Sequence, residues 1–96
     1  MRIASIDRTK LDPVIQEKVD RLNQAKLEAV EIEDFDQAKF FKHIVDKLLI
    51  IGNQIQQLTF EKQNAIENED YDMAKRLKYR IEDLTQTAYK IHMPVP

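Results

Sequence analysis

Residues 33–39 read EDFDQAK, and 36 residues later residues 69–75 read EDYDMAK. An aspartate side chain competes with helical hydrogen bonds inside a helix, but it caps the start of a new helix well. Asp34 and Asp70 are therefore expected to separate consecutive helices, each followed by a further acid in the first helical turn, where the helix dipole favours negative charge. We predict two tight corners formed by Asp34, Phe35, Asp36, Asp70, Tyr71 and Asp72.

The rest of the chain favours long helices. Its composition is 43% hydrophobic and 33% charged, with a single glycine and three prolines, a balance typical of helices and poor in turns. Asp12-Pro13 is a helix start, and apolar residues at three- and four-residue spacing follow each predicted start. Gln37 stands three residues after Asp34, the spacing of a capping box. The predicted helices are 12–33, 35–68 and 71–91.

The repeat extends beyond the corners. At an offset of 36 residues Leu22 matches Leu58, and Ala29 matches Ala65. Self-similarity at a fixed period indicates duplicated supersecondary units, and short corners make neighbouring helices antiparallel. We predict an all-α fold in which three antiparallel helices form two overlapping helical hairpins that share the middle helix. Because 36 residues are about ten helical turns, both outer helices are expected on the same side of the middle helix.

Residues 11–92 form the predicted helical domain. Residues 1–10 have no clear period and are predicted to be a flexible lead, and residues 93–96 are predicted to start a linker. Gly52 falls inside the middle helix, where glycine costs about 1 kcal/mol relative to alanine. It is therefore expected either to bend the helix or to admit another backbone.

The middle helix is apolar around its whole circumference near residues 48–51. A helix that is apolar around its whole circumference is expected to be buried by other elements on every side. We predict that a second stripe on this helix, made of Phe40, Ile44 and Ile51, is a self-association interface, giving a homodimeric helical bundle. The alternative is that these residues belong to a core shared with the outer helices.

Net charge and composition limit the classes of molecule that the chain is expected to bind. The net charge of −2 does not favour nucleic acid or an anionic membrane, so protein partners are expected. The chain has no cysteine, as expected for reducing cytoplasm. One basic run, Lys75, Arg76, Lys78 and Arg80, is a candidate electrostatic contact with tubulin or nucleic acid. Alternatively, it is a solvated face whose bases pair with acids one turn away.

No residue pattern predicts catalysis. Two aspartates at each corner fall far short of the oxygen ligands of a calcium site, and capping explains them better. His43 and His92 have no ligand partner at metal-binding spacing and no adjacent nucleophile. We predict that the chain is not an enzyme and uses no cofactor or metal.

The phrase from Phe35 to Leu48, with Ala38, Phe41, Lys42 and Val45 at fixed spacing, is repeated from Tyr71 to Leu84. It resembles the UVR motif, a helical hairpin named from bacterial nucleotide-excision-repair subunits. In that family hairpins from two chains pair into a four-helix unit. The sequence departs from the bacterial form at Lys42 and Lys78, where arginine is usual.

A wider likeness runs from Leu11-Asp12-Pro13-Val14 through both acidic corners to Lys75. It resembles the tandem-UVR coiled-coil segment of the centrosomal protein of 104 kDa family, which acts at the ciliary tip. The resemblance implies a scaffolding segment of a microtubule-associated protein of the cytoplasm and cytoskeleton, located at the cilium tip or centriole. Tubulin and other tip proteins would bind elsewhere in the full-length protein. The alternatives are a DNA-repair adapter and a direct microtubule or nucleic-acid binder.

Overall fold

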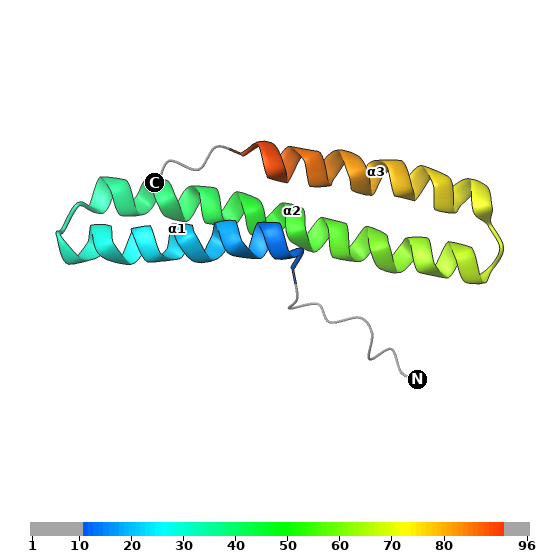
Figure 1. Cartoon of the computed structure of the whole chain (residues 1–96), viewed down its shortest axis with the longest axis horizontal. Coiled ribbons are helices and arrows are strands. Elements are labelled where there is room, and N and C mark those ends of the chain that lie inside the picture. The colour runs from blue at the N-terminus through cyan, green and yellow to red at the C-terminus, as the bar shows by residue number, and fades with distance from the viewer. Residues whose placement is uncertain (1–10, 92–96) are drawn as a thin grey trace, which may run out of the picture.

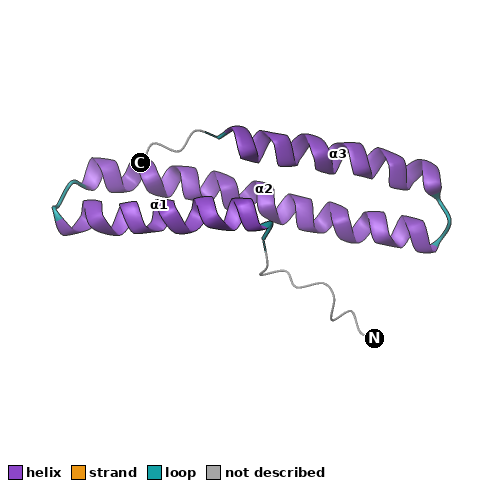
Figure 2. Cartoon of the chain, viewed as in Figure 1, coloured by secondary structure: helices purple, strands orange, loops and turns teal. Residues whose placement is uncertain are grey.

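The structure, a computed structural model, describes residues 11–91. Three helices form almost all of this part: α1 (Pro13–Glu31), α2 (Phe35–Glu67) and α3 (Tyr71–Lys90), arranged as two hairpins that share α2 (Figure 1). Only short loops connect the helices (Figure 2). The predicted all-α class is confirmed, and every predicted helix end falls within two residues of the observed one. The predicted lead at 1–10 and the linker at 93–96 lie outside the described residues.

Helix α1 begins at the predicted cap. The Asp12 carboxylate accepts hydrogen bonds from the backbone N–H groups of Val14 (3.0 Å) and Ile15 (3.3 Å). Pro13 occupies the first turn, where its missing N–H costs nothing because that group has no partner within the helix. The capping bonds of this start are therefore made by neighbouring residues, as the sequence predicted.

The first corner ends one helix and begins the next without a spacer. Glu33 N–H donates to the carbonyl of Val30 (3.0 Å), and Asp34 N–H donates to that of Ala29 (2.8 Å), the two bonds of a Schellman motif. That motif needs a left-handed residue, and here it is Glu33, with φ of 61°. Asp34 then accepts a hydrogen bond from Gln37 N–H (3.2 Å) and caps α2.

The second corner repeats the arrangement. Glu69 has φ of 59° and donates to the carbonyl of Ile66 (3.0 Å), while Asp70 N–H donates to that of Ala65 (2.8 Å). Asp70 caps α3 by accepting from Met73 N–H (3.2 Å). The predicted capping role of both aspartates is confirmed. The full capping box is not formed, because the Asp34 N–H that Gln37 would bind is already used by Ala29.

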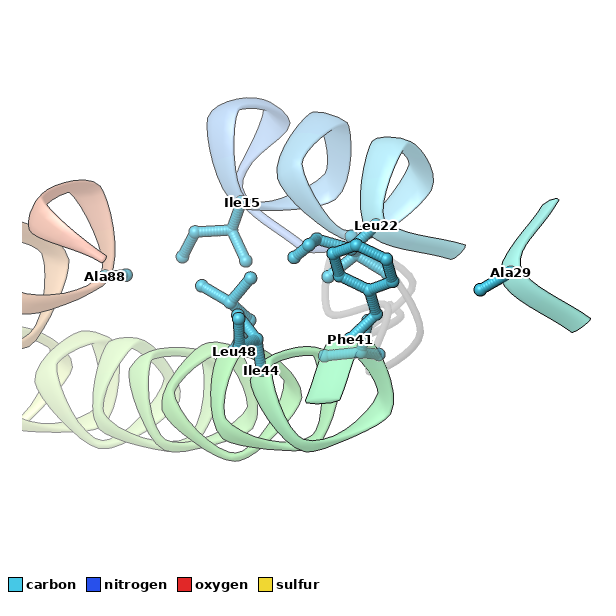
Figure 3. Packing of buried hydrophobic residues seen from close by; sticks show 9 residues of the cluster. Ile15, Leu22, Ala29, Phe41, Ile44, Leu48 and Ala88 are labelled. Carbon is cyan, nitrogen blue, oxygen red and sulfur yellow. The ribbon is translucent and has the colours of Figure 1, made fainter. Parts of the chain in front are cut away.

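Helix α1 packs along the first half of α2. Ile15, Leu22 and Leu48 are completely buried, and Figure 3 shows Ile15 and Leu22 of α1 turned toward Phe41, Ile44 and Leu48 of α2. Burying each of these large side chains contributes about 1.5–3 kcal/mol. The seam of the first hairpin, where α1 packs against α2, therefore excludes water.

Helix α3 packs along the second half of α2, and this seam is more open. Ala65 and Ala88 are buried, whereas the larger residues of the seam are only half-buried. These half-buried residues are Ile55, Leu58, Leu77, Ile81 and Leu84. The second hairpin therefore leaves part of its apolar surface in contact with water.

The two outer helices use different sides of α2. Ala65, beneath α3, lies about 120° around the helix from Phe41, which faces α1, at 3.6 residues per turn. Figure 1 accordingly shows α1 and α3 on different sides of α2, each along one half of its length. The expectation that both share one side is wrong. Helix α2 is the second helix of the first hairpin and the first helix of the second hairpin. It packs against α1 and α3 through two different stripes of apolar residues.

The outer helices meet at the middle of α2. Lys18 Nζ donates to the carbonyl oxygens of Tyr89 (3.0 Å) and Ile91 (2.9 Å), which end α3. The Tyr89 hydroxyl donates to the Asp12 carboxylate (3.0 Å), which caps α1. A lysine at a helix C-terminus satisfies carbonyls that have no partner within the helix and complements the dipole. These three bonds tie the two hairpins together.

Gly52 lies beneath the start of α1. A Cβ at this position would lie 2.6 Å from Leu11 Cδ2 and 3.9 Å from Ile15 Cγ2. Helix α2 continues through it from Phe35 to Glu67. The close approach predicted from the sequence is therefore made by a leucine side chain rather than by another backbone.

We predict that replacing Glu33 or Glu69 by glycine stabilises the chain. A left-handed conformation costs about 1–2 kcal/mol for a residue with a Cβ, and the greater freedom of glycine in the unfolded chain cancels part of that gain. The free energy of unfolding in urea should rise by about 0.5–1 kcal/mol for each change. Glu17→Gly, inside α1, is the control and should lower it by about 1 kcal/mol. Loss of stability in Glu33→Gly would contradict the corner geometry.

The contact between Tyr89 and Asp12 predicts an altered titration. The hydrogen bond to Asp12, together with burial and the Asp12 charge, raises the pKa of Tyr89 above 10.0. Because the folded pKa is raised, the stabilisation is present at lower pH and is lost as pH rises through the folded pKa. In Asp12→Asn, which still caps α1, NMR titration of Tyr89 should give a lower pKa. An unchanged pKa would show that the contact is not made in solution.

Candidate interaction surfaces

The predicted corner residues lie at the capped starts of α2 and α3, and their side chains are largely solvent-exposed. Asp34 and Asp70 bind backbone N–H groups, and Asp36 and Asp72 lie in the first turns of α2 and α3. Phe35 and Tyr71 are more than three-fifths exposed. No group of three or more potential metal ligands occurs within residues 11–91. The acids therefore serve the corners, and the two aromatic rings are presented to solvent.

The three predicted self-association residues do not share one surface. Ile44 is 9% exposed and belongs to the core formed with α1 and the end of α3. Ile51 is partly buried against that core, as in the alternative interpretation from the sequence. Phe40 is 50% exposed. Of the three, Phe40 alone offers a large apolar surface to a second chain.

Phe40 lies on the outer face of α2, where its ring is 5.9 Å from that of Phe41. Asp36, Lys39 and His43 share this face and line a shallow open groove beside the ring. Farther along, Lys42 Nζ lies 2.8 Å from the Asp46 carboxylate, and that hydrogen bond lowers the pKa of Asp46. Phe40 is thus an apolar side chain surrounded by charged residues, an arrangement that suits contact with another protein.

The predicted basic run lies on the exposed surface of α3. Lys75, Arg76, Lys78 and Arg80 are all exposed, and the one ion pair within residues 11–91, Lys42–Asp46, includes none of them. Lys78 Nζ lies 5.6 Å from the centre of the Tyr79 ring. The pairing with acids one turn away that the sequence suggested is therefore not formed, and the charges are available to a partner.

The sequence analysis did not assign a binding role to the apolar residues of the first corner. Leu27, Val30, Ile32 and Phe35 are between 45% and 75% exposed, with Ile32 the most exposed. We call these four residues the first-corner patch. The repeat contained a signal for this patch, because the residues that match Leu27 and Ile32 at an offset of 36 are the polar Gln63 and Asn68.

The second corner has a small groove between α2 and α3. Ala65, Met73 and Leu77 form its apolar part, and Glu61 and Asp70 are among its polar lining. At the position of Leu77, the first hairpin has Phe41, which is buried. The larger phenylalanine side chain is one reason why the first seam is closed and the second is not.

The described part of the chain has no helix both long and apolar enough to cross a membrane. Within the same residues, the histidine at position 43 stands on an exposed helix face next to Phe40 and Asp46. The groove beside it is also lined by Asp36, Lys39 and Lys42, and none of its lining side chains is a hydroxyl or thiol nucleophile. The features that the structure brings together are apolar and charged surfaces on helices, which are suited to binding another protein.

Comparison with known proteins agrees with this architecture. Residues 52–86 match the family described as UVR, the UvrB/uvrC motif, and they span the second half of α2, the second corner and most of α3. No curated protein and no solved structure matches the chain. The match covers little more than a third of the sequence. It shows that the second hairpin is similar to a helical protein–protein interaction motif.

Proposed function

We propose that this chain is a non-catalytic self-association segment of a ciliary-tip, microtubule-associated protein. Two hairpins that share one helix form an elongated rod, with principal extents of 55 × 27 × 17 Å. The observation that carries the proposal is Phe40, a phenylalanine half-exposed on the outer face of α2, a helix whose second half belongs to the hairpin that matches the UVR motif. An exposed aromatic ring with a polar rim is typical of a protein contact.

The position of Phe40 supports a second chain as its partner. Helix α3 ends at Lys90, near the middle of α2 (Figure 1). Ile44 is buried in the core to which Ala88 of α3 also belongs, whereas Phe40 is 50% exposed. The stripe predicted from the sequence is therefore divided: one part is covered within the chain and the other is left open. A second copy covering Phe40 completes the burial that the apolar middle helix requires.

The ciliary assignment rests on the resemblance of both hairpins to the centrosomal protein of 104 kDa family. Each of the two corner sequences that carry this resemblance joins two helices into a hairpin, and both corners have the same backbone hydrogen bonds. The proposed location is the cytoplasmic cytoskeleton at the cilium tip or centriole. Tubulin and tip proteins would then bind other parts of the full-length protein.

The proposed mechanism is avidity. Joining two chains brings two copies of every neighbouring module together and raises the effective concentration of the second binding event. A rigid helical rod fixes their separation better than a flexible linker does. No chemical step is required of the segment.

The solution mass of the chain tests this proposal. Wild type should be a dimer by light scattering, and Phe40→Glu should be a monomer with unchanged helical circular dichroism, because a buried unpaired charge opposes association. Val14→Glu is the matched control, since Val14 is also an exposed apolar residue but lies on α1. It should remain dimeric. A monomeric wild type, or a dimeric Phe40→Glu variant, would contradict the proposal.

A further inference from the structure

The first-corner patch is not required by the fold. Both corners have the same backbone hydrogen bonds and left-handed glutamate, yet the second corner is built with more polar residues. Leu27 corresponds to Gln63 and Ile32 to Asn68 at the same offset, while Val30 and Phe35 correspond to the apolar Ile66 and the aromatic Tyr71. The second corner therefore acts as an internal control, because its Asn68 and Gln63 permit the same turn. The exposed apolar side chains of the first corner call for another explanation, which is contact with a partner.

The negative charge around this patch limits the kind of surface that can bind to it. Residues 27–36 contain five carboxylates and no lysine or arginine. Two first corners in contact would bring these like charges together, which costs free energy. The partner surface must therefore be basic, with an apolar or aromatic side chain among its charges.

This chain carries such a surface itself. The basic run on α3 has no ion pair within the described residues, and Tyr79, which lies within it, is 53% exposed. Because the run lies close to the second corner, it is near the opposite end of the rod from the first corner (Figure 1). The surfaces cannot meet within one chain, but they can meet between two.

We propose that two copies pair antiparallel, so that the first-corner patch of each copy packs against the basic run of the other. A two-fold axis across the rod repeats the contact at both ends and closes the assembly. The inference rests on the proposed self-association and adds its orientation and its charge pattern. Each contact joins apolar residues such as Ile32 and Phe35 to Tyr79, with carboxylates facing Arg76 and Arg80.

Charge reversal on each side tests the pairing. The first variant is Glu31→Lys/Glu33→Lys, at the patch, and the second is Arg76→Glu/Arg80→Glu, in the basic run. These four side chains are exposed, and neither aspartate cap is changed. Like charges then face each other at both ends of either homodimer, so each variant alone should associate at least about tenfold more weakly than wild type.

Mixing the two variants should restore pairing. In the mixed dimer the lysine-bearing corner of one copy meets the glutamate-bearing run of the other, and the opposite end keeps the wild-type contact. Light scattering should therefore return the dimer mass at concentrations where either variant alone is monomeric. Glu67→Lys/Glu69→Lys, the matched change at the second corner, should not weaken association. Leu27→Gln/Ile32→Asn/Phe35→Tyr, which copies second-corner residues, should weaken association while circular dichroism shows an unchanged helix content.

The outcomes separate this inference from the proposed function. A dimeric wild type whose two reversed variants dimerise as tightly as it does would overturn the antiparallel contact and leave self-association standing. Failure of the mixture to restore the dimer would also overturn it. Masses that grow beyond a dimer would overturn the two-fold closure. A monomeric wild type would overturn both proposals.

Discussion

The fold depends on the chain reversing direction within three residues at each corner. A left-handed glutamate ends one helix by a Schellman motif, and the next residue, an aspartate, caps the following helix. The aspartate N–H binds the old helix while its carboxylate binds the new one. With so few residues between them, neighbouring helices must run antiparallel and pack side by side. Each hairpin seam follows from that geometry.

Sharing α2 between two hairpins has a structural consequence. Because its two roles use different stripes, α1 and α3 cover separate halves and sides, and neither covers the outer face near Phe40. The long-range bonds of Lys18 and Tyr89 then hold the end of α3 against α1, and Ala88 of α3 belongs to the same core as Ile44 and Leu48. The fold therefore decides which apolar residues remain available for a partner, and these are on the outer face of α2 and at the first corner.

Local sequence was sufficient to predict the helices and corners, because caps and apolar spacing act over a few residues. Asp12, Asp34 and Asp70 were identified this way. The left-handed glutamates were not, since that conformation favours glycine or asparagine and no local signal points to Glu33. Ile44 is buried in a core built from residues of all three helices, and the Tyr89–Asp12 bond joins residues 77 positions apart. Neither can be read from periodicity. The first-corner patch could have been found by comparing Ile32 with Asn68 in the repeat.

The reversal of the chain at both corners is tested most directly by one distance within a single molecule. Spin labels on cysteines at the exposed positions Glu17 and Lys90, in a chain with no other cysteine, would be measured after dilution with unlabelled protein. The two-hairpin fold predicts a short distance, because the neighbouring Lys18 and Tyr89 are in hydrogen-bond contact. A distance of about 110 Å, that of 73 residues in one continuous helix at 1.5 Å per residue, would contradict it.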